Sequence, residues 1–112
     1  MNILYFYPGQ QVTIITEIKD NDGNRVDPLI LPVVNKIIKP DLTEFENYPQ
    51  NMIKINTGIY YFKFNLPSGA ISIGSYLTDI QYTHPTTNIL NNKLYQIIVL
   101  APFGNFTASV GI

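Results

Sequence analysis

Hydrophobic and polar residues alternate along most of this chain, with the period of two that is typical of a half-buried β-strand. Residues with high strand propensity, namely Val, Ile, Tyr, Phe and Thr, dominate the alternating segments. The segments predicted as strands are residues 11–19, 31–39, 51–56, 59–66, 75–83, 93–100 and, as a short last strand, 106–112.

The alternation also groups side chains by face, because successive side chains of a strand point to opposite sides of the sheet. The sets placed together on one face are Val12, Ile14, Thr16 and Ile18; Ile53 and Ile55; Tyr60, Phe62, Phe64 and Leu66; Tyr76, Thr78, Ile80 and Tyr82; and Leu94, Gln96, Ile98 and Leu100 against Tyr95, Ile97 and Val99. Tyr60 and Phe62 lie in the most aromatic segment, so we expect both to be buried.

Turn-forming residues separate these segments, for example Asp22-Gly23 and Pro67-Ser68-Gly69. No segment shows a helical stripe, although Asp41 and Glu44 could cap a single helical turn in residues 41–48. About seven short strands in 112 residues predict an all-β fold, an antiparallel β-sandwich, with a closed barrel as the alternative. We expect one complete domain spanning residues 1–112.

The stretch IKDNDGNRVDP, residues 18–28, could be either a metal-binding loop or a turn. The side chains that could offer oxygen ligands to calcium are those of Asp20, Asp22, Asn24 and Asp27. An EF-hand loop places a glycine at its sixth position and an acid at its twelfth, and this stretch does not. Lys19 and Arg25 also offset the negative charge. We therefore predict a turn, in which Gly23 supplies the positive φ that Asp-Gly turns require.

Charge is scarce and unevenly placed. Charged residues make up 13% of the chain against about 25% in typical domains, and the net charge is −1. Most of the charges lie between Glu17 and Lys54, and residues 1–16 carry none. A neutral surface suits a permanent protein neighbour, although the composition of an AT-rich genome would also lower the charge. It argues against nucleic acid and membranes as partners.

The residues needed for catalysis are not gathered in the sequence. His84, the single histidine, precedes Pro85 in a predicted loop, and the chain has no cysteine to share a metal site with it. Outside the stretch at residues 18–28, Glu44 and Glu46 form a close carboxylate pair, which fits a solvated loop. No glycine-rich phosphate loop is present. The first ten residues, MNILYFYPGQ, lack the basic region and the cleavage site of a secretory signal, so we expect none. We therefore expect neither an enzyme nor a cofactor.

One motif, NTGIYYF, resembles the tyrosine corner of immunoglobulin-like sandwiches, whose pattern is Asp-x-Gly-x-Tyr-x-Cys. Asn56, Gly58, Tyr60 and Phe62 occupy the corresponding positions. The acid and the cysteine differ, and the chain has no tryptophan, so it is not an antibody-type domain. The resemblance implies an Ig-like β-sandwich, while the plainer alternative is that Tyr60 is an ordinary core aromatic.

A longer run of motifs, FYPGQQVTI, IKDNDGNRVDP, IIKPDLTEF, TGIYYFKFNLP and GSYLTDIQY, resembles the Ig-like domains of tailed-phage virion proteins. It is also similar to macroglobulin-like and adhesin domains of bacterial surface proteins. The Asn- and Ile-rich composition is similar to that of crass-like phage proteins. The phage resemblance implies a structural virion protein on the capsid surface, an auxiliary or decoration protein that binds the major capsid protein or other virion proteins.

The alternative function is an adaptor, receptor-binding or glycan-binding module of a phage tail or fibre. A lectin-like site needs exposed aromatic rings beside amide or carboxylate groups. The residues that could build one are Tyr5, Tyr7, Tyr95, Asn91 and Asn92.

The two uncharged ends, residues 1–16 and 94–112, supply the candidate partner-binding residues. These are Tyr5, Phe6, Tyr7, Phe103 and Phe106. Exposed edge strands normally carry protecting charges, and aromatic side chains dominate the energetics of interfaces. We therefore expect at least one end to be covered by a virion protein or by a second copy of the chain in a homo-oligomer. In the alternative, the two ends pair with each other and join the domain's own core.

Overall fold

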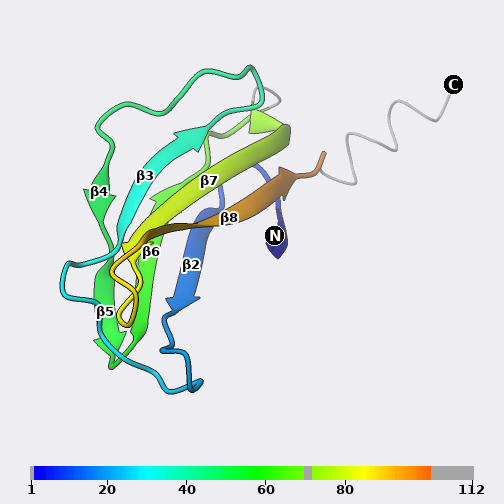
Figure 1. Ribbon diagram of the computed structural model, residues 1–112. Helices are drawn as coiled ribbons and strands as arrows, with labels where there is room; N and C mark the ends of the chain where they lie inside the picture. Colours follow the sequence, from blue (N-terminus) through cyan, green and yellow to red (C-terminus); the bar gives the residue numbers. More distant parts are fainter. Residues whose placement is uncertain (1, 70–71, 102–112) are drawn as a thin grey trace, which may run out of the picture.

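The structure is a computed structural model, and it describes residues 2–69 and 72–101. These residues form β-strands and connecting loops, with no α-helix among them. The strands are β1 (Asn2–Phe6), β2 (Gln11–Glu17), β3 (Val33–Ile38), β4 (Gln50–Asn51), β5 (Ile53–Asn56), β6 (Ile59–Asn65), β7 (Gly74–Thr83) and β8 (Leu90–Val99). Figure 1 shows β7 and β8 as a long hairpin crossing in front of β2 and β6. The all-β prediction is confirmed.

The strands form two sheets. The larger has five strands in the order β1-β8-β7-β3-β4, and the smaller has three in the order β2-β6-β5. The paired strands are antiparallel except β1 and β8, which run parallel with Tyr5 opposite Ile98. The prediction of a purely antiparallel sandwich is therefore wrong for β1. Its partner lies at the other end of the chain, and no local turn could fix their relative direction.

Both sheets contribute to one apolar core, as expected for two sheets packed face to face. The core residues include Val12, Ile14, Tyr60, Phe62 and Phe64 from the smaller sheet and Val34, Ile37, Tyr76, Ile80, Tyr95, Ile97 and Val99 from the larger. The predicted face of β2 and that of β6 are confirmed, and on β8 the Tyr95 set is the buried one. Ile53 and Ile55 share the exposed face of β5.

Strands β1 and β4 are not among the predicted strands, and the predicted strand at residues 106–112 lies outside the described residues. The helical turn that residues 41–48 could have formed is absent. Asp41 Oδ1 does accept the Thr43 backbone N–H at 3.0 Å, but Leu42 has φ of 69° and cannot continue a helix. The chain then extends, and the Phe45 N–H donates to the Ile37 carbonyl.

The acid-rich stretch forms the predicted tight turn. Asp20 Oδ1 accepts the backbone N–H groups of Asp22 and Asn24, each at 2.9 Å, and Gly23 has φ of 86°. A single bridge between Lys19 and Arg25 closes the turn, so it is not a hairpin between two full strands. The chain leaves it through Asp27 and Pro28 toward β3 in the other sheet.

A candidate protein-binding surface

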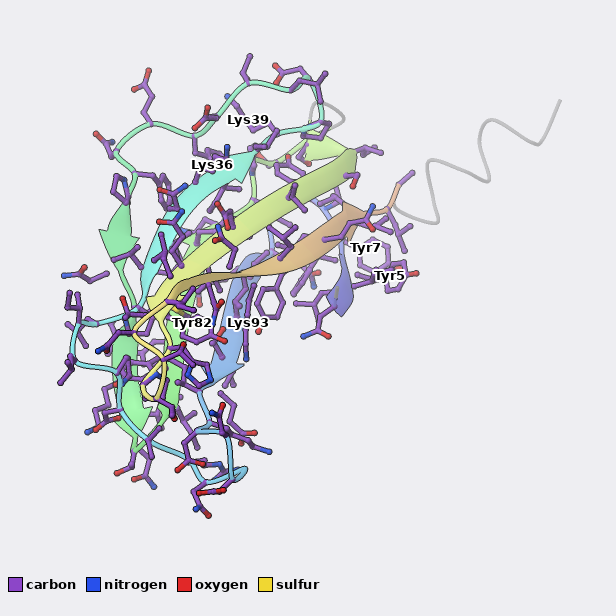
Figure 2. The ribbon with its side chains drawn as sticks, in the orientation of Figure 1. Tyr5, Tyr7, Lys36, Lys39, Tyr82 and Lys93 are labelled. Carbon is purple, nitrogen blue, oxygen red and sulfur yellow. The ribbon has the colours of Figure 1, made fainter. Side chains whose placement is uncertain are left out.

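The exposed aromatic residues of the N-terminal end are held by β1, whose alternation decides which rings face outward. Tyr5 is 62% exposed and Ile3 48%, whereas Leu4 and Phe6 turn inward and pack against the core. Just after the strand, Tyr7 is again exposed, and its backbone N–H donates to Gln10 Oε1 at 2.8 Å. We call Ile3, Tyr5 and Tyr7 the N-terminal patch; Figure 2 shows both tyrosines beside β1.

A hollow of about 480 Å³ lies where the two sheets meet at β1 and β2. Its lining residues are Asn2, Ile3, Leu4, Thr13, Ile15 and Tyr95. The Tyr95 hydroxyl lies 3.0 Å from Thr16 Oγ1 and donates to the Ile15 carbonyl at 3.2 Å, which ties β8 to β2. Three of the lining residues are apolar and three carry an amide or a hydroxyl, and none is an acid or a base.

Two further apolar regions are exposed on other sides of the domain. Leu29 is 87% exposed and Ile30 69%, and with Leu31 they form the loop patch between Pro28 and Pro32. On the outer face of the smaller sheet Ile15, Ile53 and Ile55 are each more than half exposed. The sequence interpretation missed the loop patch, because it assigned Leu31 to a strand. The sequence feature that could have indicated this patch is an apolar run enclosed by two prolines.

Asp79 on the larger sheet is satisfied by two asparagines, whereas the buried Thr78 Oγ1 on the same strand has no hydrogen-bond partner among the described residues. Asp79 is nearly buried on β7, and its carboxylate accepts hydrogen bonds from Asn92 Nδ2 at 2.7 Å and Asn35 Nδ2 at 3.2 Å. These bonds link β3, β7 and β8 side by side. The cluster therefore stabilises the larger sheet.

Lys93 joins the two sheets at the end of β8 remote from the N-terminal patch. Its ammonium donates to the Glu17 carbonyl at 2.5 Å and lies 5.8 Å from the centre of the Tyr82 ring (Figure 2). Burial lowers the pKa of Lys93, while the nearby Glu17 carboxylate acts in the opposite direction. The charge of this side chain is thus engaged by β2 and by an aromatic face.

Glu17 and two acids of the turn at residues 18–28, Asp20 and Asp27, are engaged within the protein, whereas the Asp22 carboxylate makes no hydrogen bond or ion pair among the described residues. Glu17 binds Lys19 and Arg25, Asp20 holds the turn, and Asp27 contacts Lys54, Gly58 and Tyr60. Within the described residues no group of three or more His, Cys, Asp or Glu side chains could hold a metal ion.

Tyr60 is buried, but its hydroxyl donates to the Asp27 carboxylate and not to nearby backbone, unlike a standard tyrosine corner.

His84 organises the connection between β7 and β8. Its Nδ1 accepts the backbone N–H groups of Thr86 and Thr87 at 3.1 and 3.3 Å. Glu44 forms a bridge with Ile38 in the loop after β3. Both residues thus have local structural contacts.

The residues proposed for a glycan site are not brought together. Tyr95 faces the core, and Asn92 is bonded to Asp79. Tyr5 lies opposite Ile98, six residues along β8 from Asn92, which corresponds to roughly 20 Å. The exposed rings of Tyr5 and Tyr7 therefore have neither asparagine beside them.

The candidate partner-binding residues have different outcomes. Tyr5 and Tyr7 are exposed as a partner-binding role requires, whereas the Phe6 ring packs against the core. Phe103 and Phe106 lie outside the described residues.

No protein-family model matches the sequence, and no curated protein or solved structure matches it either. The described part of the chain contains no helix able to span a membrane.

Proposed function

We propose that this protein is a structural component of a tailed-phage virion, an auxiliary or decoration protein that binds the major capsid protein on the shell. The observation that carries the proposal is the exposure of large apolar side chains on several sides of a small domain that has few charges. Leu29, Ile30 and Tyr5 are among the most exposed of these side chains. Such surfaces are rare on free monomers and common at permanent contacts.

The order of the strands supports an Ig-like version of the sandwich. In a variable-type immunoglobulin domain one sheet contains strands C, F and G with C′ beside C, and the other contains B, E and D. Here β4, β3, β7 and β8 follow the order C′, C, F and G, and β2, β6 and β5 follow B, E and D. The chain lacks the disulfide and the core tryptophan of antibody domains. The support therefore comes from topology alone.

The proposed mechanism is stabilisation by mass action. A protein that binds the assembled shell and not its free subunits shifts the equilibrium toward the shell. This role needs shape and apolar contact, and it needs no catalytic group. Asp79, Lys93 and His84 fit this role, because each is engaged in structural contacts of the domain itself.

The test is co-sedimentation of the purified protein with heads and with tails of the phage that encodes it. We expect the protein to sediment with tail-less heads and to raise the temperature at which they break open. Leu29→Ser with Ile30→Ser should weaken binding. Leu42→Ser is the matched control, because Leu42 is 83% exposed but lies in another loop.

Binding to tails and not to heads would contradict the proposal and favour the adaptor function. Failure to bind either would contradict both. Equal loss of binding in the control and in the loop variant would remove the loop patch from the contact.

A further inference from the structure

The outer edge of β1 presents backbone groups that no described strand uses. The Leu100 N–H donates to the Phe6 carbonyl at 2.9 Å, so the backbone of Phe6 faces β8. The backbone N–H and C=O groups of successive residues in a strand point to opposite sides. The N–H and C=O groups of Ile3 and Tyr5 therefore point away from the sheet. Within residues 2–69 and 72–101, no strand pairs with this side of β1.

The other three sheet edges carry features that discourage pairing with another strand. Strand β4 is two residues long and follows Pro49, and β5 has a register shift and carries Lys54. On the outer edge of β2, the carbonyls of Ile15 and Glu17 accept hydrogen bonds from Tyr95 and Lys93 of the opposite sheet. Short length, bulges, lysines and covered carbonyls all protect an edge. Strand β1 shows none of these among its described contacts.

We propose that β1 pairs with β1 of a second copy, antiparallel, across a two-fold axis at Leu4. In this register Ile3 lies opposite Tyr5 of the second copy, and both open residues of each chain form backbone hydrogen bonds. Each exposed tyrosine then covers an exposed isoleucine, a favourable cross-strand pair. An axis at Ile3 would place Tyr5 opposite Met1, outside the described residues, and an axis at Tyr5 would place Ile3 opposite Tyr7, whose N–H already donates to Gln10.

A second copy fits this edge better than an unrelated strand, for reasons that lie in the strand itself. A two-fold contact requires a self-complementary surface, and the two open residues exchange places under the axis at Leu4. Residues 1–16 carry no charge, so two such edges meet without repulsion. The result is one continuous sheet through both copies. The association belongs to the isolated protein and is independent of the proposed function in the virion.

The first test is sedimentation velocity of the full chain over a range of concentrations. We expect a dimer whose dissociation constant rises by about tenfold in Tyr5→Lys, since two cross-strand pairs are lost. The matched control is Ile98→Lys, which adds the same charge to the same face, one strand in from the edge. This control should leave the dimer intact.

Three results would overturn the proposal. The first is a wild-type chain that stays monomeric throughout. The second is equal weakening by Tyr5→Lys and Ile98→Lys, which would assign the contact to the sheet face. The third is a full chain that stays monomeric while the chain without residues 102–112 dimerises. That result would show that residues 102–112 occupy the edge of β1 in the full chain.

The register has a separate test, because the chain contains no cysteine. Ile3→Cys and Tyr5→Cys change two exposed side chains that lie opposite each other in the proposed dimer. Their Cα atoms would be about 5.5 Å apart, within the range of a disulfide. An oxidised mixture of the two variants should form the mixed disulfide faster than either variant links to itself. Equal rates in all three samples would refute the axis at Leu4.

Discussion

At the scale of single residues, Asp27 is the side chain that ties the acid-rich turn to the smaller sheet. It pairs with Lys54, accepts the Gly58 N–H at 2.8 Å and accepts the Tyr60 hydroxyl at 2.9 Å. The hydrogen bonds from Lys54, Gly58 and Tyr60, in that order, lower the pKa of Asp27 from 3.8 to about 2. Burial and the bond to Asp27 raise the pKa of Tyr60 to about 12. The pair therefore favours a charged carboxylate beside a neutral phenol.

This contact predicts a defined pH dependence for Asp27→Asn. The folded pKa is below the unfolded one, so the ionised carboxylate stabilises the fold above the unfolded pKa and loses that effect as pH falls from about 4 to about 2. We expect the variant to melt below the wild type at neutral pH, and the gap to close over that acid range. Thermal melts of both proteins at a series of pH values measure it. A gap that stays constant would contradict the role of the charge.

Phe62 and Lys63 test which face of β6 is buried. Phe62 is 7% exposed in the core, and its neighbour Lys63 points to solvent. Phe62→Ala should lower the free energy of unfolding by about 3–5 kcal/mol, and Lys63→Ala should change it by no more than about 0.5 kcal/mol. Urea unfolding of the two variants gives both values. The reverse order would mean that the register of β6 is shifted by one residue.

At the scale of elements, the sequence predicts the long strands well because their two faces differ in polarity. Val12 and Ile14 alternate with polar or exposed residues, and this pattern assigns the buried face of β2. Strand β1 lacks such contrast, since Leu4, Tyr5 and Phe6 are all apolar, and its parallel pairing depends on residues near the other end of the chain. The loop patch is apolar as well, but prolines on both sides limit its pairing. The local alternation of apolar and polar residues cannot predict a pairing between distant segments or the exposure of an apolar loop.

Two glycines with positive φ distinguish a turn from a close approach between elements. Gly23 has open space around it, whereas a Cβ on Gly58 would lie 2.7 Å from the Ile18 carbonyl oxygen and 2.9 Å from the Val26 nitrogen. Gly23→Ala should cost only the backbone penalty of about 1–2 kcal/mol. Gly58→Ala should lower the free energy of unfolding by more, because the added Cβ would also push the turn away from β6. Denaturant unfolding compares them, and equal losses would show that crowding at Gly58 has no effect.

At the scale of the whole molecule, the candidate surface was only partly predictable. An uncharged, aromatic end suggested exposed rings, and Tyr5 and Tyr7 are exposed. Consecutive residues of a strand cannot all face outward, and this turns Phe6 inward against the core. The same alternation turns Tyr95 inward and removes it from the proposed glycan site. Which aromatic rings can meet a partner therefore depends on which face of its strand each residue occupies. The number of aromatic residues in a segment does not give that information.

The last prediction concerns a chain truncated after Pro102, which lacks Phe103 and Phe106. Every described strand ends at or before Val99, so the truncated chain retains both sheets and their core residues. We expect its melting temperature to match that of the full chain and its binding to phage heads to be lost.

Because the surface is nearly neutral, head binding by the full chain should also change little with salt concentration.

Melting curves and co-sedimentation with heads, run side by side on the full and truncated chains, separate the alternatives. The structure already pairs the two ends in part, because β1 pairs with residues 95–99 of β8. A large drop in melting temperature would mean that residues 103–112 also complete the core. Unchanged melting together with unchanged binding would exclude Phe103 and Phe106 as anchors. The contact would then have to be made by the N-terminal patch or the loop patch, whose exposed side chains lie on the folded sandwich itself.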